Sequence, residues 1–309
     1  MKTITISAGC FNEKGNVTQM YERFKSVFND LPDYDFILQL IDNYSTDGTR
    51  QEIEELCSKD KRVRSIFNTR NFGHIRSPFY GFLQAEGDAI FTTVSDLQVE
   101  PEIIKDFIKK WENGADIVLG IKSKSQDTYA LSIFRKLYYF LINKLSDVPQ
   151  KRNFIGIGLY DKSAADAIKS LNDPYPYFRG MVFEVGFKTE EVVYEQKPRP
   201  RGITKNNFMS LYDVAMLGIC SNSKIPLRVM TLVGFLSSFV SFLFGMFYLT
   251  YKLINWNSFR IGMAPVIIGL FFLGSIQLIF LGIIGEYIGF IFTNVQRRPL
   301  VIEEKRINF

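Results

Sequence analysis

Few residues in this sequence can form disulfides or bind transition metals. Its 309 residues include three cysteines, Cys10, Cys57 and Cys220, and a single histidine, His74. Three widely spaced cysteines indicate neither a disulfide framework nor a zinc site, and His74 has no second His or Cys nearby to complete a metal set. The apolar run after Met1-Lys2 is too short for a secretory signal. We therefore expect the first 200 residues to stay in the reducing cytoplasm.

A large excess of one charge is also missing. The formal net charge is +5, and bases and aromatics do not interleave in a way that would indicate nucleic acid as a partner. The basic excess is local instead: residues 195–228 hold six Lys/Arg against two acids, Glu195 and Asp213. Such a cluster is typical of a chain that meets the anionic face of a membrane.

Two long runs carry no charge at all. They are 23 residues between Arg228 and Lys252 and 25 residues between Arg260 and Glu286. A membrane-spanning helix needs about 20 apolar residues, so we predict two spans, about 229–251 and 263–290; the alternative is a pair of buried core helices. More Lys/Arg flank the pair than lie between its members. This predicts a multi-pass protein of the inner (cytoplasmic) membrane with both termini and the catalytic domain in the cytoplasm.

Strand and helix patterns alternate over the preceding 200 residues. Apolar strand patterns are predicted at 3–9, 34–41, 62–68, 88–94, 115–121 and 153–161, and helices at 16–28, 49–57, 76–86, from 101 onward and at 128–145. This alternation predicts an α/β fold with a mostly parallel sheet and helices on both faces. We assign residues 1–205 to this domain, 206–226 to a helix in the membrane interface and 227–309 to the two spans and a cytoplasmic tail. A helix buried in the soluble core is the alternative for 206–226.

Polar clusters follow successive predicted strands. They are Asn12-Glu13, Asp42-Asn43, Asn68 to His74 and Ser95 to Gln98. Ligands of parallel sheets bind at the carboxyl ends of the strands. Taken singly, each residue has a structural explanation: Asp47-Gly48, for example, is most simply a turn and helix cap. Their shared position indicates a site. The polar segment 122–127 is a candidate flap over it.

The stretch TTVSDLQVEPE (92–102) is similar to a strand end that holds a divalent metal through a D-x-D pair, but its first position is Val94. With FNEKGNV, IDNYSTDGT, RNFGH and RGITKNN, and with two C-terminal spans, the chain resembles glycosyltransferase family 2 enzymes that glycosylate polyprenyl phosphate, including dolichol-phosphate mannose synthases and bacterial undecaprenyl-phosphate sugar transferases. The bacterial two-span type is the better match. The resemblance covers nearly the whole chain.

The resemblance implies a GT-A fold and an inverting transfer of sugar from a nucleotide-diphosphate donor, with a UDP-sugar as first choice, to a membrane lipid phosphate. It implies that Asp96 and Gln98 hold Mg²⁺ or Mn²⁺, and that Asp42 and Asn43 hold the nucleoside. Basic residues would face the phosphates of donor and lipid: Arg179, Arg199, Arg201 and Lys205. We count Asp96, Arg179, Arg201 and Lys205 as catalytic candidates. The donor-binding candidates are Asn12, Glu13, Asp42, Asn43, Arg70, Asn71, Ser95 and Arg199.

The chain departs from the family pattern at three positions. Val94 replaces the first metal-binding Asp, and Gly156 and Gly158 replace the Asp and Arg of a G-D-F-R-L stretch. These losses leave a modified metal site of reduced affinity, or a relic, as alternatives. They also motivate the rival hypothesis of a catalytically impaired scaffold. A processive polysaccharide synthase is disfavoured because the sequence lacks a Q-x-x-R-W motif.

A thinner metal site can be sufficient for this chemistry. A phosphate monoester has its second pKa near ~6, so the attacking oxygen is already an anion at neutral pH and no strong general base is needed. Mg²⁺ takes one or two carboxylates plus substrate phosphates and waters. In the spans, small residues at four-residue spacing, such as Gly285 and Gly289, allow close helix packing and are compatible with a homo-oligomer.

Overall fold

Within the residues that the computed structural model describes (1–123, 151, 153–197, 208–255 and 263–309), eight strands form one sheet in the order β7-β5-β6-β4-β1-β2-β3-β8. The strands are β1 Lys2–Cys10, β2 Tyr34–Asp42, β3 Val63–Asn68, β4 Ala89–Val94, β5 Ile117–Lys122, β6 Phe154–Asp161, β7 Thr189–Tyr194 and β8 Glu303–Ile307. The central strands β3, β2, β1 and β4 are parallel to one another, whereas β6 and β8 run antiparallel to their neighbours.

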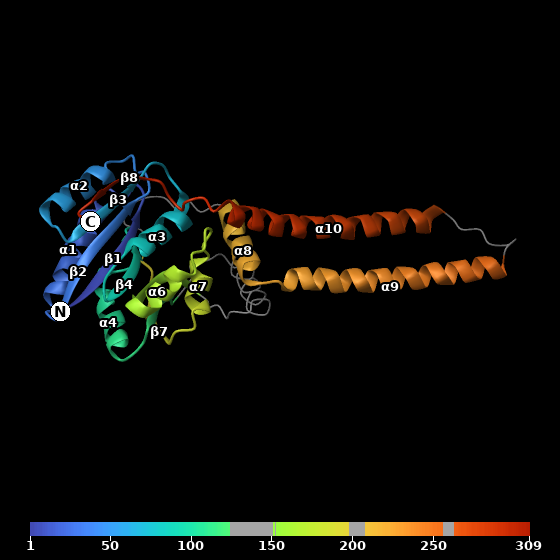
Figure 1. The fold of residues 1–309 in the computed structure, drawn as a ribbon, viewed down its shortest axis with the longest axis horizontal. Helices are drawn as coiled ribbons and strands as arrows, with labels where there is room; N and C mark the ends of the chain where they lie inside the picture. Colours follow the sequence, from blue (N-terminus) through green and yellow to red (C-terminus); the bar gives the residue numbers. More distant parts are fainter. Residues whose placement is uncertain (124–150, 152, 198–207, 256–262) are drawn as a thin grey trace.

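Helices cover both faces of this sheet (Figure 1). They are α1 Asn16–Asn29, α2 Thr49–Lys59, α3 Gly73–Gln84, the 3₁₀ turn η1 Pro101–Ile103, α4 Ile104–Glu112, α6 Lys162–Ser170 and α7 Phe178–Glu184. Apolar residues of α1, α2 and α4, such as Phe24, Ile53 and Phe107, share one buried cluster. Residues of α3, α6 and α7, such as Phe82, Ile168 and Met181, share a second. The two clusters account for the near-continuous apolar runs of β1 and β2, which are buried on both faces.

The GT-A-type α/β fold expected from the alternating patterns is confirmed. Each predicted strand is present within two residues of its expected bounds, and the parallel centre places the ends of β1, β2 and β4 at one edge. Asn16 is the first residue of α1 and does not cap it; the cap position is Gly15, in a left-handed conformation. The predicted helix 128–145 and most of the candidate flap 122–127 lie outside the described residues.

Two long apolar helices leave the sheet domain together (Figure 1). They are α9 Ile225–Ile254 and α10 Met263–Gln296, preceded by α8 Phe208–Asn222. Both are long and apolar enough to cross a membrane, and their apolar side chains are largely exposed, for example Phe235 at 74% and Leu278 at 70%. A pair of buried core helices is therefore excluded, and membrane association is the arrangement that covers this surface.

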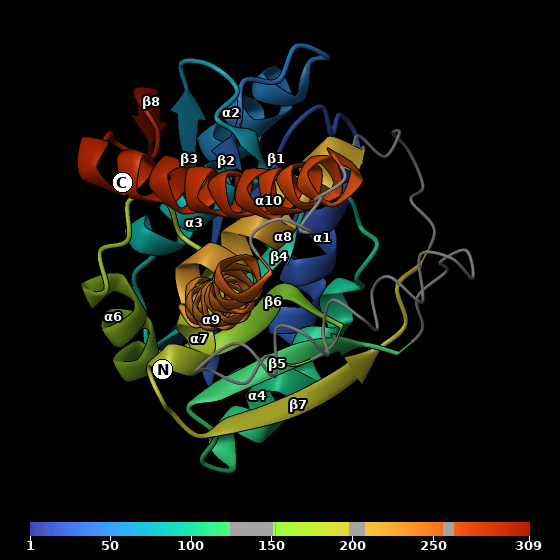
Figure 2. The ribbon, with the colours of Figure 1, turned by 90° about the vertical axis from the view of Figure 1, so that its right-hand side faces the viewer.

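The chain returns to the sheet after α10. Strand β8 pairs antiparallel with β3, next to α2 (Figures 1 and 2). The end of the chain is also held by side chains: Arg76 donates to the carbonyl of Pro299 at 2.6 Å, and Asn308 donates to the carbonyls of Cys57 and Val63. The sequence analysis treated these last residues only as a tail, because EEKRI has no apolar alternation.

Candidate active site

The loops after β1 and β2 are joined by reciprocal hydrogen bonds. The backbone N–H of Asn12 donates to Ser45 Oγ at 2.9 Å, and the N–H of Thr46 donates to Asn12 Oδ1 at 2.9 Å. The N–H of Glu13 donates to Thr49 Oγ1 at 2.8 Å. Asn12 adopts a left-handed φ of 58°, which asparagine tolerates better than most residues. Asn12 and Glu13 thus lie at the same edge as Asp42, as their strand-end positions predicted.

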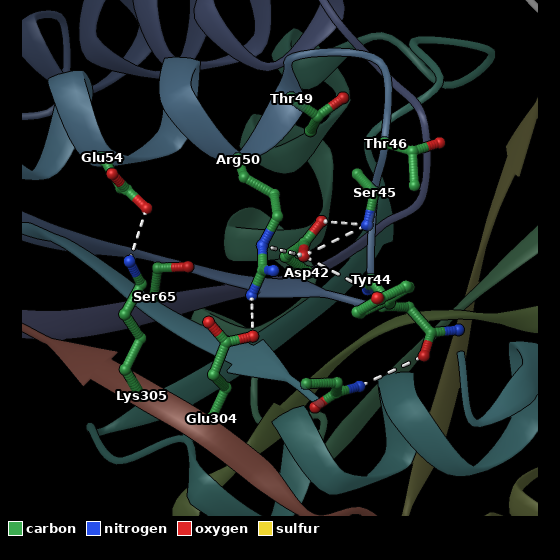
Figure 3. Close-up of polar contacts among 12 residues, drawn as sticks. Asp42, Tyr44, Ser45, Thr46, Thr49, Arg50, Glu54, Ser65, Glu304 and Lys305 are labelled. Carbon is green, nitrogen blue, oxygen red and sulfur yellow. Dashed lines mark hydrogen bonds and ion pairs between the residues drawn. The ribbon is translucent and has the colours of Figure 1, made fainter. Parts of the chain in front are cut away.

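Asp42 is wholly buried where β2 ends. Its carboxylate accepts the N–H groups of Tyr44 and Ser45 at 3.2 and 3.1 Å and pairs with Arg50 Nε at 3.1 Å (Figure 3). Burial raises the pKa of Asp42, against the opposing effects of the Ser45 hydrogen bonds and of the Arg50 charge. In this arrangement a nucleoside would meet the loop that Asp42 holds rather than the carboxylate itself.

Asn43 uses its whole amide internally. Its Nδ2 donates to Asn71 Oδ1 at 2.9 Å and to the carbonyl of Gly73 at 3.2 Å, while its Oδ1 accepts from Asn68 Nδ2 and from the N–H of Phe72. Asn43 therefore fixes the loop after β3 to the loop after β2. Arg70 is exposed and stacks on Phe72, with 4.1 Å between the guanidinium carbon and the ring centroid.

The end of β4 carries the metal-binding candidates. Ser95 is buried and donates to the carbonyl of Gly9 at 2.9 Å, so it fastens β4 to β1. Asp96 is 5% exposed, and its Oδ1 accepts the N–H of Gln98 at 3.1 Å in a tight turn. Val94 is 40% exposed. The position that carries a carboxylate in the family pattern thus faces solvent and has room for one.

Gln98 connects this turn to the segment that follows β7. Its Oε1 accepts from Gln196 Nε2 at 2.7 Å, and its Nε2 donates to the carbonyl of Lys197 at 3.2 Å. The N–H of Lys197 donates back to the Gln98 carbonyl at 3.0 Å. Arg199, Arg201 and Lys205 lie outside the described residues, in the segment that starts from this contact.

Arg179 lies near Asp96, and Tyr194 is between them. Burial and then the Asp96 charge raise the pKa of Tyr194 to about 12, while Arg179 opposes this rise. The Tyr194 hydroxyl is buried and has no hydrogen-bond partner among the described residues. Desolvation and the Arg179 charge lower the pKa of His74, which places His74 in the same region. The sequence analysis did not single out Tyr194; its place at the end of a strand, just before the basic loop, was the available signal.

The glycines that replace the family's Asp and Arg have conformational reasons. Gly156 has a φ of +100°, in the left-handed region that side chains rarely adopt, and a Cβ on Gly158 would come within 2.8 Å of the carbonyl of Val118. Thr92 Oγ1 donates to the carbonyl of Gly156 at 2.7 Å and holds this strand against β4. The chain is built around glycine here, so the family's two side chains cannot simply be restored.

The described residues do not form a complete protein metal site. Within the described parts of the chain, no group of three or more His, Cys, Asp or Glu side chains could hold a metal ion. Asp96 supplies one carboxylate at the strand end, and the Gln98 oxygen already accepts one hydrogen bond but has a second lone pair. This donor set fits a Mg²⁺-type ion that takes most of its ligands from substrate phosphates and water.

A mostly parallel sheet with polar loops at the ends of β1, β2 and β4 and a buried carboxylate after β4 defines a nucleotide-sugar transferase of the GT-A type. Comparison with known proteins gives the family. Residues 8–168 match Glycosyl transferase family 2, and relatives more than 30% identical align over nearly the whole chain. The chain belongs to this family and is a glycosyltransferase.

Two relatives and two solved structures illustrate the likeness. The SfII prophage-derived bactoprenol glucosyl transferase of Shigella flexneri is 34% identical, covering 98% of this chain and 97% of that protein. Putative glycosyltransferase CsbB of Bacillus subtilis is 32% identical, covering 98% and 92%. Mannosyl-3-phosphoglycerate synthase from Rubrobacter xylanophilus gives a TM-score of 0.47 at 12% identity, covering 70% and 71%. The mannosyltransferase PcManGT from Pyrobaculum calidifontis, in complex with GDP-Man and Mn²⁺, gives 0.45 at 12%, covering 71% and 62%.

Proposed function

We propose that this glycosyltransferase moves a sugar from a nucleotide-diphosphate donor to polyprenyl phosphate at a membrane surface. The observation that carries the proposal is end-to-end likeness to relatives named bactoprenol glucosyl transferase, which extends over 98% of the chain and so includes α9 and α10. Bactoprenol is a polyprenyl lipid. A soluble transferase would have no use for two apolar helices whose side chains face outward.

The donor would bind along the ends of β1, β2 and β4. The loop 43–48, held by Asp42 and joined to Asn12, would take the nucleoside, and a UDP-sugar is our first choice. Asp96, with Gln98 beside it, would hold Mg²⁺ or Mn²⁺, and the ion would neutralise charge on the diphosphate. Arg179 approaches this place from α7, and Tyr194 separates it from Asp96.

The acceptor phosphate would enter between this site and the membrane. Arg199, Arg201 and Lys205 follow Lys197, whose backbone is hydrogen-bonded to Gln98. Cations that start from the metal-binding turn are suited to hold a lipid phosphate beside the donor. The acceptor oxygen is already an anion at neutral pH, so these residues would align it and stabilise the leaving diphosphate rather than remove a proton.

For the membrane arrangement we propose that residues 1–205 form the catalytic domain, 206–226 an interfacial helix, and 227–309 two spans and a tail, with both termini in the cytoplasm. Two features support this. Helices α9 and α10 leave and rejoin the same sheet domain, because β8 pairs with β3. The Lys/Arg residues that flank the helix pair also favour both ends inside. An inner-membrane, multi-pass protein follows, and pairing through the small residues of the spans would give a homo-oligomer.

The experiment is incubation of membranes that contain the protein with polyprenyl phosphate and a panel of nucleotide sugars, followed by mass analysis of the extracted lipid. We expect one donor to add one hexose-sized or related unit to the lipid, and chelation to abolish the product. Membranes carrying Asp96→Asn are the matched control. If no donor gives a lipid product while the protein is folded and membrane-bound, the proposal fails and the scaffold hypothesis motivated by Val94, Gly156 and Gly158 replaces it.

A further inference from the structure

Strand β8 carries an irregularity at Glu304. In its pairing with β3, Lys305 lies opposite Phe67 and Glu303 lies opposite Asn68, so two steps along β8 correspond to one step along β3. Glu304 is the extra residue of a β-bulge. Bulges re-aim side chains, because the two residues at the bulge no longer alternate between the faces of the sheet.

The contacts of β8 follow this irregularity. Glu303 and Arg306 reach α3, where they bond to Tyr80 and, in the case of Arg306, also to Gln84. Glu304 and Lys305 are consecutive, yet both reach α2 on the opposite face: Glu304 pairs with Arg50 and Lys305 with Glu54, each at 2.7 Å (Figure 3). Without the bulge only one of these two side chains could point toward α2.

Arg50 joins the bulge to the buried carboxylate. One guanidinium nitrogen, Nε, lies 3.1 Å from Asp42 Oδ2, and another, Nη2, lies 2.7 Å from Glu304 Oε2. The guanidinium carbon is 5.1 Å from the ring centroid of Phe67 and 5.8 Å from that of Tyr44. Its side chain is 19% exposed and that of Asp42 is not exposed at all. A long, otherwise mobile side chain is thus fixed at both ends of its planar fork.

The loop that depends on Asp42 is under local strain. Tyr44 has a φ of 70°, an uncommon conformation for a bulky residue, and its N–H and that of Ser45 donate to the Asp42 carboxylate. Ser45 and Thr46 then meet Asn12 from the loop after β1. Any displacement of the Asp42 carboxylate would be passed to the loop 43–48.

From this chain of contacts we infer that Glu304 is a positioning residue for donor binding: delivered by the β8 bulge, it holds Arg50 against Asp42 and so fixes the loop 43–48 on which the nucleoside is bound. The inference rests on the proposed donor site. It gives the segment after the second apolar helix a part in catalysis, although that segment lies more than 250 positions away from Asp42 in the sequence. The Glu304 side chain is 44% exposed, so the expected effect is on geometry more than on stability.

The test compares Glu304→Gln with Lys305→Gln in the full-length, membrane-reconstituted protein. Lys305 is the matched control, because it lies on the same strand, reaches the same helix and forms an ion pair of the same length with 43% exposure, but contacts neither Arg50 nor Asp42. The first readout is amide hydrogen exchange of the segment 43–48, which requires no donor. We expect exchange at least threefold faster in Glu304→Gln and unchanged in Lys305→Gln.

The second readout is the donor KM and kcat of both variants. Glu304→Gln should raise the donor KM about three- to fivefold with kcat within twofold, since the loop binds donor and not the reacting phosphate, and Lys305→Gln should match the wild type. Unchanged exchange in Glu304→Gln, or equal changes in both variants, would overturn the inference. If Glu304→Gln does not fold, Glu304→Asp retains the charge on a shorter arm, and wild-type exchange in that variant would overturn the inference too. Absence of transfer with every donor would refute the proposed function but leave the exchange result to decide the role of Glu304.

Discussion

The polar loop after β2 and the polar loop after β4 leave the same edge of the sheet, on either side of β1, but their side chains are used differently. After β2, Asp42 and Asn43 spend their polar atoms on neighbouring backbone groups and on Arg50 and Asn71. After β4, Val94 faces solvent, and the buried Asp96 lies in a region shared with Tyr194 and Arg179. The first loop is a scaffold for a ligand, whereas the second brings charged groups to it.

This difference separates two kinds of experimental effect. Changes in the loop after β2 should act on stability and donor affinity, because its polar groups stabilise the fold. Changes around Asp96 should act on turnover, because charge placed at a reacting group is worth most in the transition state. Each prediction below can break or sharpen this division.

The largest expected effect is that of Asp96→Asn. The amide oxygen can still accept the N–H of Gln98, so the turn should persist, but the negative charge available to a metal–diphosphate complex is lost. We expect turnover to fall at least about 100-fold with the melting temperature within a few degrees. Glu102→Gln, which alters a carboxylate 49% exposed on the surface, should keep turnover within twofold. A retained turnover in Asp96→Asn would contradict the catalytic assignment of the β4 loop.

Tyr194→Phe should have the next largest effect on turnover. The hydroxyl stays protonated at any assay pH, since burial and Asp96 raise the pKa of Tyr194 to about 12, so it can only donate or accept a hydrogen bond. We expect turnover about tenfold lower, and a free energy of unfolding that is unchanged or higher by about 1 kcal/mol, because a buried hydroxyl without a partner is removed. Tyr160→Phe, which also removes a buried hydroxyl, should leave turnover unchanged. Equal kinetics for the two variants would remove Tyr194 from the site.

Val94→Asp is expected to change metal affinity only a few-fold. Val94 is exposed, so a carboxylate can be placed there without loss of packing, and a second anionic ligand attracts the ion more strongly. In the presence of UDP, binding of Mn²⁺ measured by calorimetry should be about three- to tenfold tighter. Val94→Asn is the uncharged control and should bind Mn²⁺ as the wild type does. If Val94→Asp binds no more tightly, position 94 is outside the coordination shell.

The strands and the clustering of strand-end residues could be predicted from the sequence because both follow from local patterns. Apolar runs define β1, β2 and β4, and parallel pairing then places Asn12, Asp42 and Asp96 at one edge. Membership of the glycosyltransferase family and the apolar character of α9 and α10 were likewise predicted and are confirmed.

The division of labour at the site could not be predicted, because it depends on side-chain partners distant in the sequence. Nothing local to Asp42 indicates Glu304, and β8 has no apolar alternation to reveal it as a strand. Nothing local to Tyr194 indicates Asp96 and Arg179 either. The assigned roles of the candidate site residues remain predictions, and Arg199, Arg201 and Lys205 lie beyond the residues that the structure describes.

The smallest expected effect lies in the scaffold loop itself, at Asp47. Its carboxylate accepts the N–H of Thr49 at 3.0 Å and the N–H of Lys14 at 3.2 Å, in front of α2. Burial alone would raise the pKa of Asp47, but these hydrogen bonds outweigh it and hold the pKa below its ordinary value. Asp47→Ala should cost about 1 kcal/mol of unfolding free energy at pH 7, as loss of a helix-capping group does, and should leave turnover within twofold.

The pH dependence of that loss follows from the sign of the shift. Because the folded protein holds the Asp47 proton more weakly than the unfolded chain, the stabilisation is complete above the unfolded pKa of about 3.9 and disappears as the pH falls through the lower folded value. Chemical unfolding of wild type and Asp47→Ala between pH 7 and pH 3 should therefore show curves that converge only below about pH 4. Asp33→Ala, at another exposed acid, should track the wild type within about 0.5 kcal/mol. If Asp47→Ala instead lowers turnover tenfold at unchanged stability, the loop after β2 takes part in the reaction, and the division between the two loops is wrong.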